Sequence, residues 1–175
     1  ILIIKYKNII SVNGNSGGIL PGVKNTPEIA EIRGITPWTD VVSPPAHSAF
    51  SDSTEMLTFI DRLRQTSGLP VGIKMCVGNR DELVMLFDRM HKMNITPDFI
   101  TIDGAEGGTG AAPMEFTNYV GTPLRDGLEY VLALATRYGF RANRKNPRIA
   151  IIVSGGVLTG FDIFKYRCLG ADVWN

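Results

Sequence analysis

Residues 148–156 read RIAIIVSGG, an apolar run that ends in a serine and two glycines. A short continuous run of this kind, rich in β-branched residues, is typical of a strand buried on both faces of a parallel sheet. Residues 71–75 (VGIKM) and 98–102 (DFITI) have the same character, and each follows a proline-containing break. Residues 41–42 and 171–174 are shorter strand candidates.

Helical patterns lie between these strand candidates. Apolar residues recur every three or four positions in 56–63, 83–90, 124–135 and 161–168. Asp52 and Glu55 form a capping-like pair before the first of these helices. Pro123 is expected at the first position of the third helix, and Gly139 and Gly170 are expected where the last two helices end. This alternation of strands and helices predicts an α/β fold with helices packed outside a parallel sheet.

The length of the chain limits how much of such a fold it contains. A complete (β/α)8 barrel takes about 250 residues, so this chain has room for about four or five βα units. Either the sheet is open or the barrel is partial. Because a strand candidate runs almost to Asn175, we expect the C-terminal part of a (β/α)8 TIM barrel, forming one partial domain over residues 1–175.

Composition narrows the class of protein. The chain has 18 Lys and Arg against 17 Asp and Glu and is 44% hydrophobic, which argues against nucleic-acid binding through bulk charge. No apolar run approaches the roughly 18 residues of a membrane span, and the N-terminal residues lack the features of a signal peptide. Two separated cysteines, Cys76 and Cys168, and two lone histidines, His47 and His91, argue against a disulfide framework and a metal site. We therefore expect no metal and a cytoplasmic location.

Candidate ligand contacts follow the strand candidates, because βα folds bind ligands on loops at the carboxyl ends of strands. Residues 103–113 read DGAEGGTGAAP; their glycines allow a ligand to approach the backbone and expose N–H groups to an anion or a flavin edge. A long surface loop is the alternative. The carboxylates of Asp103 and Glu106, taken singly, are more often helix caps or solvated charges than catalytic groups. The turn at 154–156 is of a kind that binds phosphate, but such turns also occur without one.

Lys74 lies within a buried apolar strand, where an unpaired charge is unfavourable. At the ligand end of the strand it would bind an anion or stabilise negative charge on a reduced flavin; the alternative is a side chain that snorkels past the strand end. His47, in the segment after residues 41–42, is either a ligand donor or structural, and we expect Cys76 to pack. The basic residues of 141–148 are interpreted as a solvated loop, since no aromatic residues interleave with them.

Several segments together resemble one family. They are SPPAHSAFS (43–51), GIKMC (72–76), IDGAEGGTGAAP (102–113) and SGGVLTGFDI (154–163), with GGILPG (17–22) and PEIAEIRG (27–34) in the same pattern. From about Gly17 to Asn175 the chain resembles the FMN-binding synthase domain of glutamate synthase, whereas residues 1–16 match poorly. The Ala105-Glu106 pair resembles the stand-alone single-domain branch, because the large multidomain enzymes carry His-Asp there.

This resemblance implies a (β/α)8 barrel that holds FMN and serves glutamate biosynthesis and nitrogen assimilation. The implied reaction reduces 2-iminoglutarate, formed from 2-oxoglutarate and ammonia, to L-glutamate. Electrons would come from an electron-donor protein or an NAD(P)H-oxidising subunit. An iron–sulfur cluster is expected only in a longer parent chain, because its cysteines are absent from this sequence.

The resemblance also assigns roles to residues. Lys74 would lie beside flavin and substrate, and Glu106 is a candidate proton donor or substrate orienter. The residues expected to bind the cofactor are Ser43, Lys74, Gly107, Gly108, Thr109, Gly110, Ser154, Gly155 and Gly156. The chain departs from the large enzymes at Val12 and Ser16, where a Lys-Pro-Gly stretch and a Glu are expected, so the true substrate stays open.

One alternative interpretation is kept, and a second, weaker one is rejected. An incomplete or degenerate barrel would be a structural or assembly partner without catalysis, and its exposed edge strands and apolar face would favour oligomers. A different phosphate-binding barrel, such as an FMN-dependent hydroxy-acid oxidase or inosine-monophosphate dehydrogenase, does not explain SPPAHS (43–48) or EGGTG (106–110).

Overall fold

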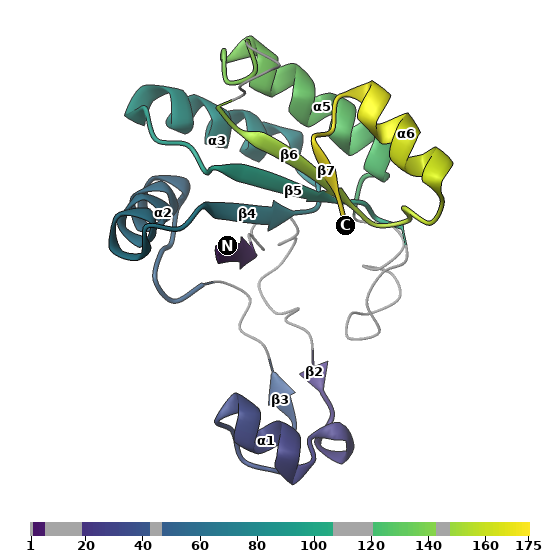
Figure 1. The fold of residues 1–175 in the computed structure, drawn as a ribbon. Helices are drawn as coiled ribbons and strands as arrows, with labels where there is room; N and C mark the ends of the chain where they lie inside the picture. Colours follow the sequence, from purple (N-terminus) through teal and green to yellow (C-terminus); the bar gives the residue numbers. More distant parts are fainter. Residues whose placement is uncertain (1, 6–18, 43–46, 107–120, 143–147) are drawn as a thin grey trace.

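The computed structural model describes residues 2–5, 19–42, 47–106, 121–142 and 148–175. Within these ranges the chain forms a five-stranded sheet with helices packed against it and a separate two-stranded sheet (Figure 1). The elements of the larger part are β1 (Leu2–Lys5), α2 (Ser53–Ser67), β4 (Val71–Met75), α3 (Arg80–Met93), β5 (Phe99–Asp103), α5 (Leu124–Arg137), β6 (Ala150–Ser154), α6 (Gly160–Leu169) and β7 (Val173–Trp174).

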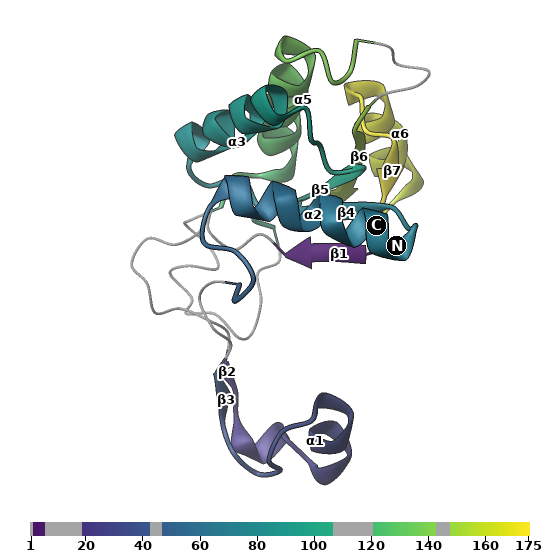
Figure 2. The ribbon, with the colours of Figure 1, turned by 90° about the vertical axis from the view of Figure 1, so that its left-hand side faces the viewer.

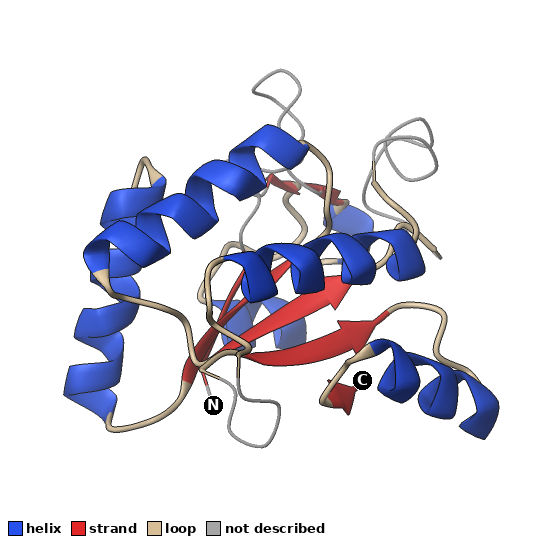
Figure 3. Cartoon of the chain, turned by 90° about the horizontal axis from the view of Figure 1, so that it is seen from above, coloured by secondary structure: helices blue, strands red, loops and turns tan. Residues whose placement is uncertain are grey.

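The five-stranded sheet is parallel throughout, with the strand order β1-β4-β5-β6-β7. Each strand therefore pairs with the next one along the chain in this sheet, whereas a doubly wound sheet reverses its order at a switch point. Helices α3, α5 and α6 lie on one side of the sheet (Figures 1 and 3). The predicted α/β fold with a parallel sheet is confirmed. The sequential order is that of a barrel, but closure into a barrel and the single partial domain stay predictions.

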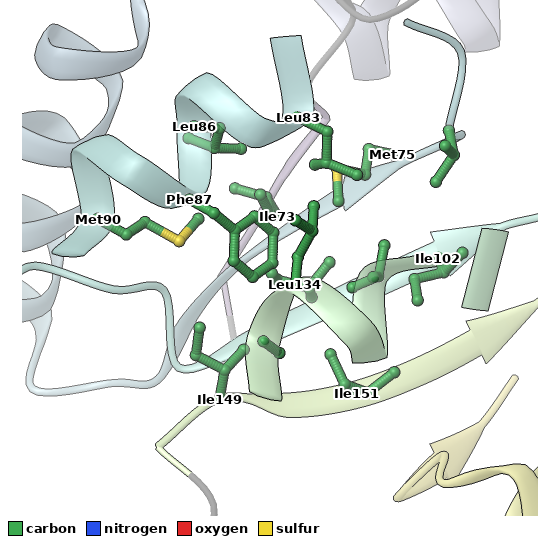
Figure 4. Close-up of a cluster of buried hydrophobic side chains, with 14 of the residues drawn as sticks. Ile73, Met75, Leu83, Leu86, Phe87, Met90, Ile102, Leu134, Ile149 and Ile151 are labelled. Carbon is green, nitrogen blue, oxygen red and sulfur yellow. The ribbon is translucent and has the colours of Figure 1, made fainter. Parts of the chain in front are cut away.

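The period of two along the strands divides their residues between two faces. Alternate strand positions join side chains of α3 and α5 in one buried cluster (Figure 4). The strand residues of that cluster are Val71, Ile73, Met75, Ile100, Ile102, Ile151 and Val153. The intervening residues Gly72, Lys74, Phe99 and Thr101 therefore belong to the face away from the helices. Phe87 of α3 is fully buried among the cluster, and burial of one such side chain stabilises the fold by about 1.5 to 3 kcal/mol.

Helix ends follow the expected chemistry with one exception. Asp52 accepts a hydrogen bond from the N–H of Glu55 (2.8 Å), and Glu55 accepts one from the N–H of Ser51 (2.7 Å), so the predicted capping pair is confirmed. Pro123 precedes α5 instead of starting it, because its ψ of 145° is extended and not helical. Gly170 ends α6 as predicted.

The strand predicted at 41–42 forms, but not in the parallel sheet. As β3 (Val41–Val42) it pairs antiparallel with β2 (Ile19–Leu20), in a unit that also holds η2 (Gly22–Lys24) and α1 (Pro27–Arg33). Figure 2 shows this unit away from the main sheet. The expectation that the segment after residue 42 follows a strand of the parallel sheet is therefore wrong, because two residues paired antiparallel to a short neighbour cannot join that ladder.

Strand β1 was not predicted from the sequence. Its residues pair in parallel with β4, with Leu2 opposite Val71 and Lys5 opposite Lys74. Its run of β-branched residues was the signal that pointed to a strand.

The interpretation of 141–148 as a solvated loop is wrong for Arg141. Its guanidinium is buried and donates to the carboxylate of Asp172 and to the carbonyls of Ile149 and Gly170. Asp172 lies just before β7, where its carboxylate is largely shielded from water and requires a positive partner.

The apolar face predicted on α6 also lies differently. The side chains of Phe161 and Phe164 are 73% and 64% exposed, and the helix buries Tyr166 instead. The helical period was right, but the face that α6 turns toward the core was not. No helix in the described ranges is long and apolar enough to cross a membrane.

Candidate functional site

Strands β4, β5 and β6 are neighbours in the sheet (Figure 1). Charged and polar residues lie at their carboxyl ends. Asp103 and Ser154 are the last residues of β5 and β6 and are paired in register. Lys74 on β4 lies opposite Thr101, so Lys74 and Asp103 share a sheet face at diagonal positions. The Nζ of Lys74 is 2.9 Å from Oδ2 of Asp103. The lysine in the apolar strand thus has a partner, as the desolvation of its charge requires.

The turn after β6 is built around two glycines with positive φ, Gly155 at 98° and Gly156 at 68°. A Cβ on Gly155 would lie 3.1 Å from the backbone N of Gly104 and 3.3 Å from Oδ1 of Asp103. The N–H of Gly104 in turn donates to the carbonyl of Ser154 (2.9 Å). Conformation and close packing together therefore require glycine at 155.

Backbone donors are available at this turn. Within the described ranges, the N–H groups of Gly156 and Val157 donate to no protein acceptor. Amides at a strand-to-helix turn form a concavity that binds anions such as phosphate. The N-terminus of α6 is engaged by its own capping box between Thr159 and Asp162. The hydrogen bonds from Thr159 and Lys165 and from the backbone at 158–159 lower the pKa of the Asp162 carboxyl to about 2.

Glu106 caps helix α5. Both oxygens of its carboxylate accept the N–H of Leu124, at 2.9 and 3.1 Å, where negative charge is favourable near the positive end of the helix dipole. The N–H of Ala105 donates to the carbonyl of Thr122 (3.1 Å), and the N–H of Thr122 donates to that of Val77 (2.8 Å). Of the alternatives that the sequence left open, the geometry gives a helix cap; a catalytic role for Glu106 stays a prediction.

Two other candidate residues have structural surroundings. Burial, above all, raises the pKa of the Cys76 thiol; the charges of Asp103 and Glu106 add to this, and a backbone hydrogen bond at Thr122 opposes it. A neutral, half-buried thiol fits a packing role. The ring of His47 stacks on Phe50 with centroids 4.5 Å apart, and its Nδ1 accepts the N–H of Ala49.

The structure brings together four of the residues expected at the site, Lys74, Ser154, Gly155 and Gly156. The remaining cofactor-binding candidates, Ser43, Gly107, Gly108, Thr109 and Gly110, lie outside the described residues.

The sequence did not identify Asp103 as the partner of Lys74. A lysine in an apolar strand was the available signal, since it requires a carboxylate nearby, but only the strand register shows which one.

Metal ligands do not gather in the described ranges, where no three His, Cys, Asp or Glu side chains form a group that could bind an ion. The expected absence of a metal and the cytoplasmic location stay predictions.

Comparison with known proteins gives the family. The family model described as the conserved region in glutamate synthase matches residues 12–175. This chain belongs to the glutamate synthase family.

Similar proteins have glutamate synthase in their names. The glutamate synthase large subunit-like protein YerD of Bacillus subtilis is 43% identical over 159 residues, covering 91% of this chain and 29% of the relative. The archaeal glutamate synthase (NADPH) of Methanocaldococcus jannaschii is 32% identical over 158 residues, covering 89% of the chain and 29% of the relative. The glutamate synthase (NADPH) large chain of Azospirillum brasilense is 33% identical over 157 residues, covering 89% of the chain and 10% of the relative. The chain thus spans less than a third of these relatives.

Proposed function

We propose that this chain supplies part of the FMN-binding catalytic barrel of a glutamate-synthase-type oxidoreductase. The reaction we propose is reduction of 2-iminoglutarate, formed from 2-oxoglutarate and ammonia, to L-glutamate. The observation that carries the proposal is the convergence of the Lys74–Asp103 pair and the glycine turn at 154–156 on one edge of a parallel sheet. Membership of the glutamate synthase family supports the class of reaction.

The residues present fit FMN in two respects. The N–H groups of Gly156 and Val157 have no acceptor among the described residues and lie at a turn that excludes a side chain at Gly155, so they suit one side of a phosphate. The half-buried ammonium of Lys74 suits an electron-rich ring that gains negative charge. When bound, FMN supplies hydride chemistry that no amino-acid side chain provides.

Each group of the chain then has a task. We propose that Lys74 stabilises negative charge beside the flavin and substrate. The glycine-rich segment 107–110 and Ser43 would line the cofactor. Glu106, held in place by the N–H of Leu124, would orient the substrate or donate a proton.

The electron donor and the substrates are proposed for the whole protein of which this chain is a part. We propose that electrons arrive from an electron-donor protein or an NAD(P)H-oxidising subunit, through an iron–sulfur cluster carried by a longer chain. Ammonia and 2-oxoglutarate are the proposed small-molecule substrates.

The test uses the full-length natural protein, stripped of flavin and titrated with FMN, and then assayed for glutamate formation with a chemically reduced electron donor. Lys74→Met is expected to weaken FMN binding about tenfold or more, because a hydrogen bond or contact to a charged group contributes about 1.5 to 3 kcal/mol. Lys92→Met is the matched control, because Lys92 on α3 is exposed and pairs with Asp88 on its own helix.

Each outcome is informative. A wild-type protein that retains no FMN contradicts the proposal and leaves the assembly-partner interpretation. If the protein retains FMN but forms no glutamate, the proposal that it is a flavoprotein stands and the proposed substrate is wrong.

A further inference from the structure

We propose that Asp103 is a positioning residue that fixes the ammonium of Lys74 and balances its charge, and that it thereby lowers the reduction potential of the bound flavin. This inference rests on the proposed function, because it assumes that FMN lies beside Lys74. It assigns a role to the Asp103 carboxylate, which the sequence by itself indicates to be a helix cap or a solvated charge.

Geometry ties Asp103 to Lys74. The Nζ–Oδ2 distance is 2.9 Å, and the two side chains are only 27% and 37% exposed. They project from adjacent strands on the sheet face opposite the helices, at its carboxyl edge. The pair is therefore partly shielded from water, where a charge interaction is stronger than at an open surface.

The glycine turn after β6 lies beside the carboxylate. Its second oxygen, Oδ1, would be 3.3 Å from a Cβ built on Gly155, so only glycine at 155 leaves that oxygen uncrowded. Asp103 thus links the lysine on β4 to the proposed phosphate turn after β6.

Comparison with other aspartates of the sheet distinguishes this role from a structural one. Asp98 accepts the backbone N–H of Val71, and Asp172 accepts that of Ile151, so each of these ties backbone together at the amino end of a strand. In the described part of the chain, the carboxylate of Asp103 has Lys74 as its polar partner. Its position at the ligand end and its partner both point to the site.

Charge balance determines the expected effect. With Asp103 present, the ammonium and carboxylate nearly cancel as seen from the flavin. Without the carboxylate, an unbalanced positive charge favours the more negative reduced flavin, and the potential rises. Without the lysine, an unbalanced negative charge remains, and the potential falls. Removal of both restores the balance.

The experiment measures the reduction potential of FMN bound to the full-length protein by spectroelectrochemistry. The variants are Asp103→Asn, Lys74→Met, the combination of both, and Asp88→Asn as control. Asp88 is a suitable control because it pairs with Lys92 on α3 and its side chain is as exposed as that of Asp103, at 37%. We expect the potential to rise with D103N, to fall with K74M, to lie near the wild-type value in the double variant, and to be unchanged by D88N.

A purely structural role for Asp103 would not produce opposite shifts that cancel. An unchanged potential in D103N, or shifts of the same sign in both single variants, overturns the inference and leaves the flavin function standing. A wild-type protein without FMN overturns both. If D103N does not fold by circular dichroism, Asp103→Ser, which also removes the charge and is smaller, takes its place under the same criteria.

Discussion

Arg141 and Asp172 show how one buried ion pair holds the C-terminal part of the sheet. Burial by itself raises the pKa of the Asp172 carboxyl. The hydrogen bonds from Arg141 and the N–H of Ile151, with the charges of Arg141 and Arg167, outweigh burial and hold that pKa below its usual value. Arg141 also donates to the carbonyls of Ile149 and Gly170. The pair therefore joins the start of β6, the end of α6 and the residue before β7.

Arg141→Met is expected to destabilise the protein by about 3 kcal/mol at neutral pH, because it leaves a shielded carboxylate without its counter-charge. Thermal or denaturant unfolding of the full-length protein measures this. Arg89→Met, at an exposed position of α3, is the control and is expected to change stability by less than about 0.5 kcal/mol. A loss in R141M no larger than in R89M would show that the pair does not stabilise the fold.

The same pair predicts acid sensitivity. The pKa of Asp172 is lower in the folded state than its usual value of 3.8. Its stabilisation is therefore present above that value and is lost as the pH falls through the folded-state pKa. Asp172→Asn is expected to flatten the fall in stability below about pH 4, which unfolding measured across this range would detect; an acid dependence identical to the wild type contradicts the assignment.

At the scale of elements, the segment from β6 to α6 contains a glycine turn and a helix start that are built in different ways. The strand ends in a turn with positive φ at Gly155 and Gly156, whereas the helix begins at Gly160 behind its own capping box. Only the first glycine is crowded by Gly104 and Asp103, and Gly160 has open space around it. Position 155 therefore requires glycine, whereas neither the backbone conformation nor the described surroundings of Gly160 require it.

Gly155→Ala is expected to lower FMN affinity about tenfold, because an L-residue at a φ of 98° is strained by about 1 to 2 kcal/mol and its Cβ meets Gly104 and Asp103. Gly160→Ala is the matched control and is expected to leave FMN affinity unchanged. Titration of both full-length variants with FMN, followed by flavin fluorescence, makes the comparison. Wild-type affinity in G155A would exclude this turn as the phosphate site.

At the scale of the whole molecule, the sequence predicted what local pattern determines. Strands β4, β5 and β6 were found within two residues because their buried faces make continuous apolar runs. The glycine turn and Lys74 stood out because each is unusual at its position. The pairings of β1 with β4, Lys74 with Asp103, and Arg141 with Asp172 were missed, because they join residues far apart in the chain and depend on strand register.

Apolar side chains remain exposed where α6 and β7 meet the solvent. They are Leu158, Phe161, Phe164, Val173 and Trp174. β7 is also an edge of the described sheet, and its free backbone groups can pair with another strand. Exposed apolar groups next to an open edge favour association.

Residues 1–175 expressed by themselves are therefore expected to self-associate, with sedimentation velocity showing larger species as concentration rises. Replacing both Phe161 and Phe164 with Ser is expected to shift the distribution toward the monomer. Met85→Ser removes one exposed apolar side chain from α3, on another part of the surface, and is expected to change nothing. If the wild-type fragment stays monomeric at every concentration, the α6–β7 surface is not an association site. If M85S acts as strongly as the phenylalanine variant, association is non-specific and does not depend on that surface.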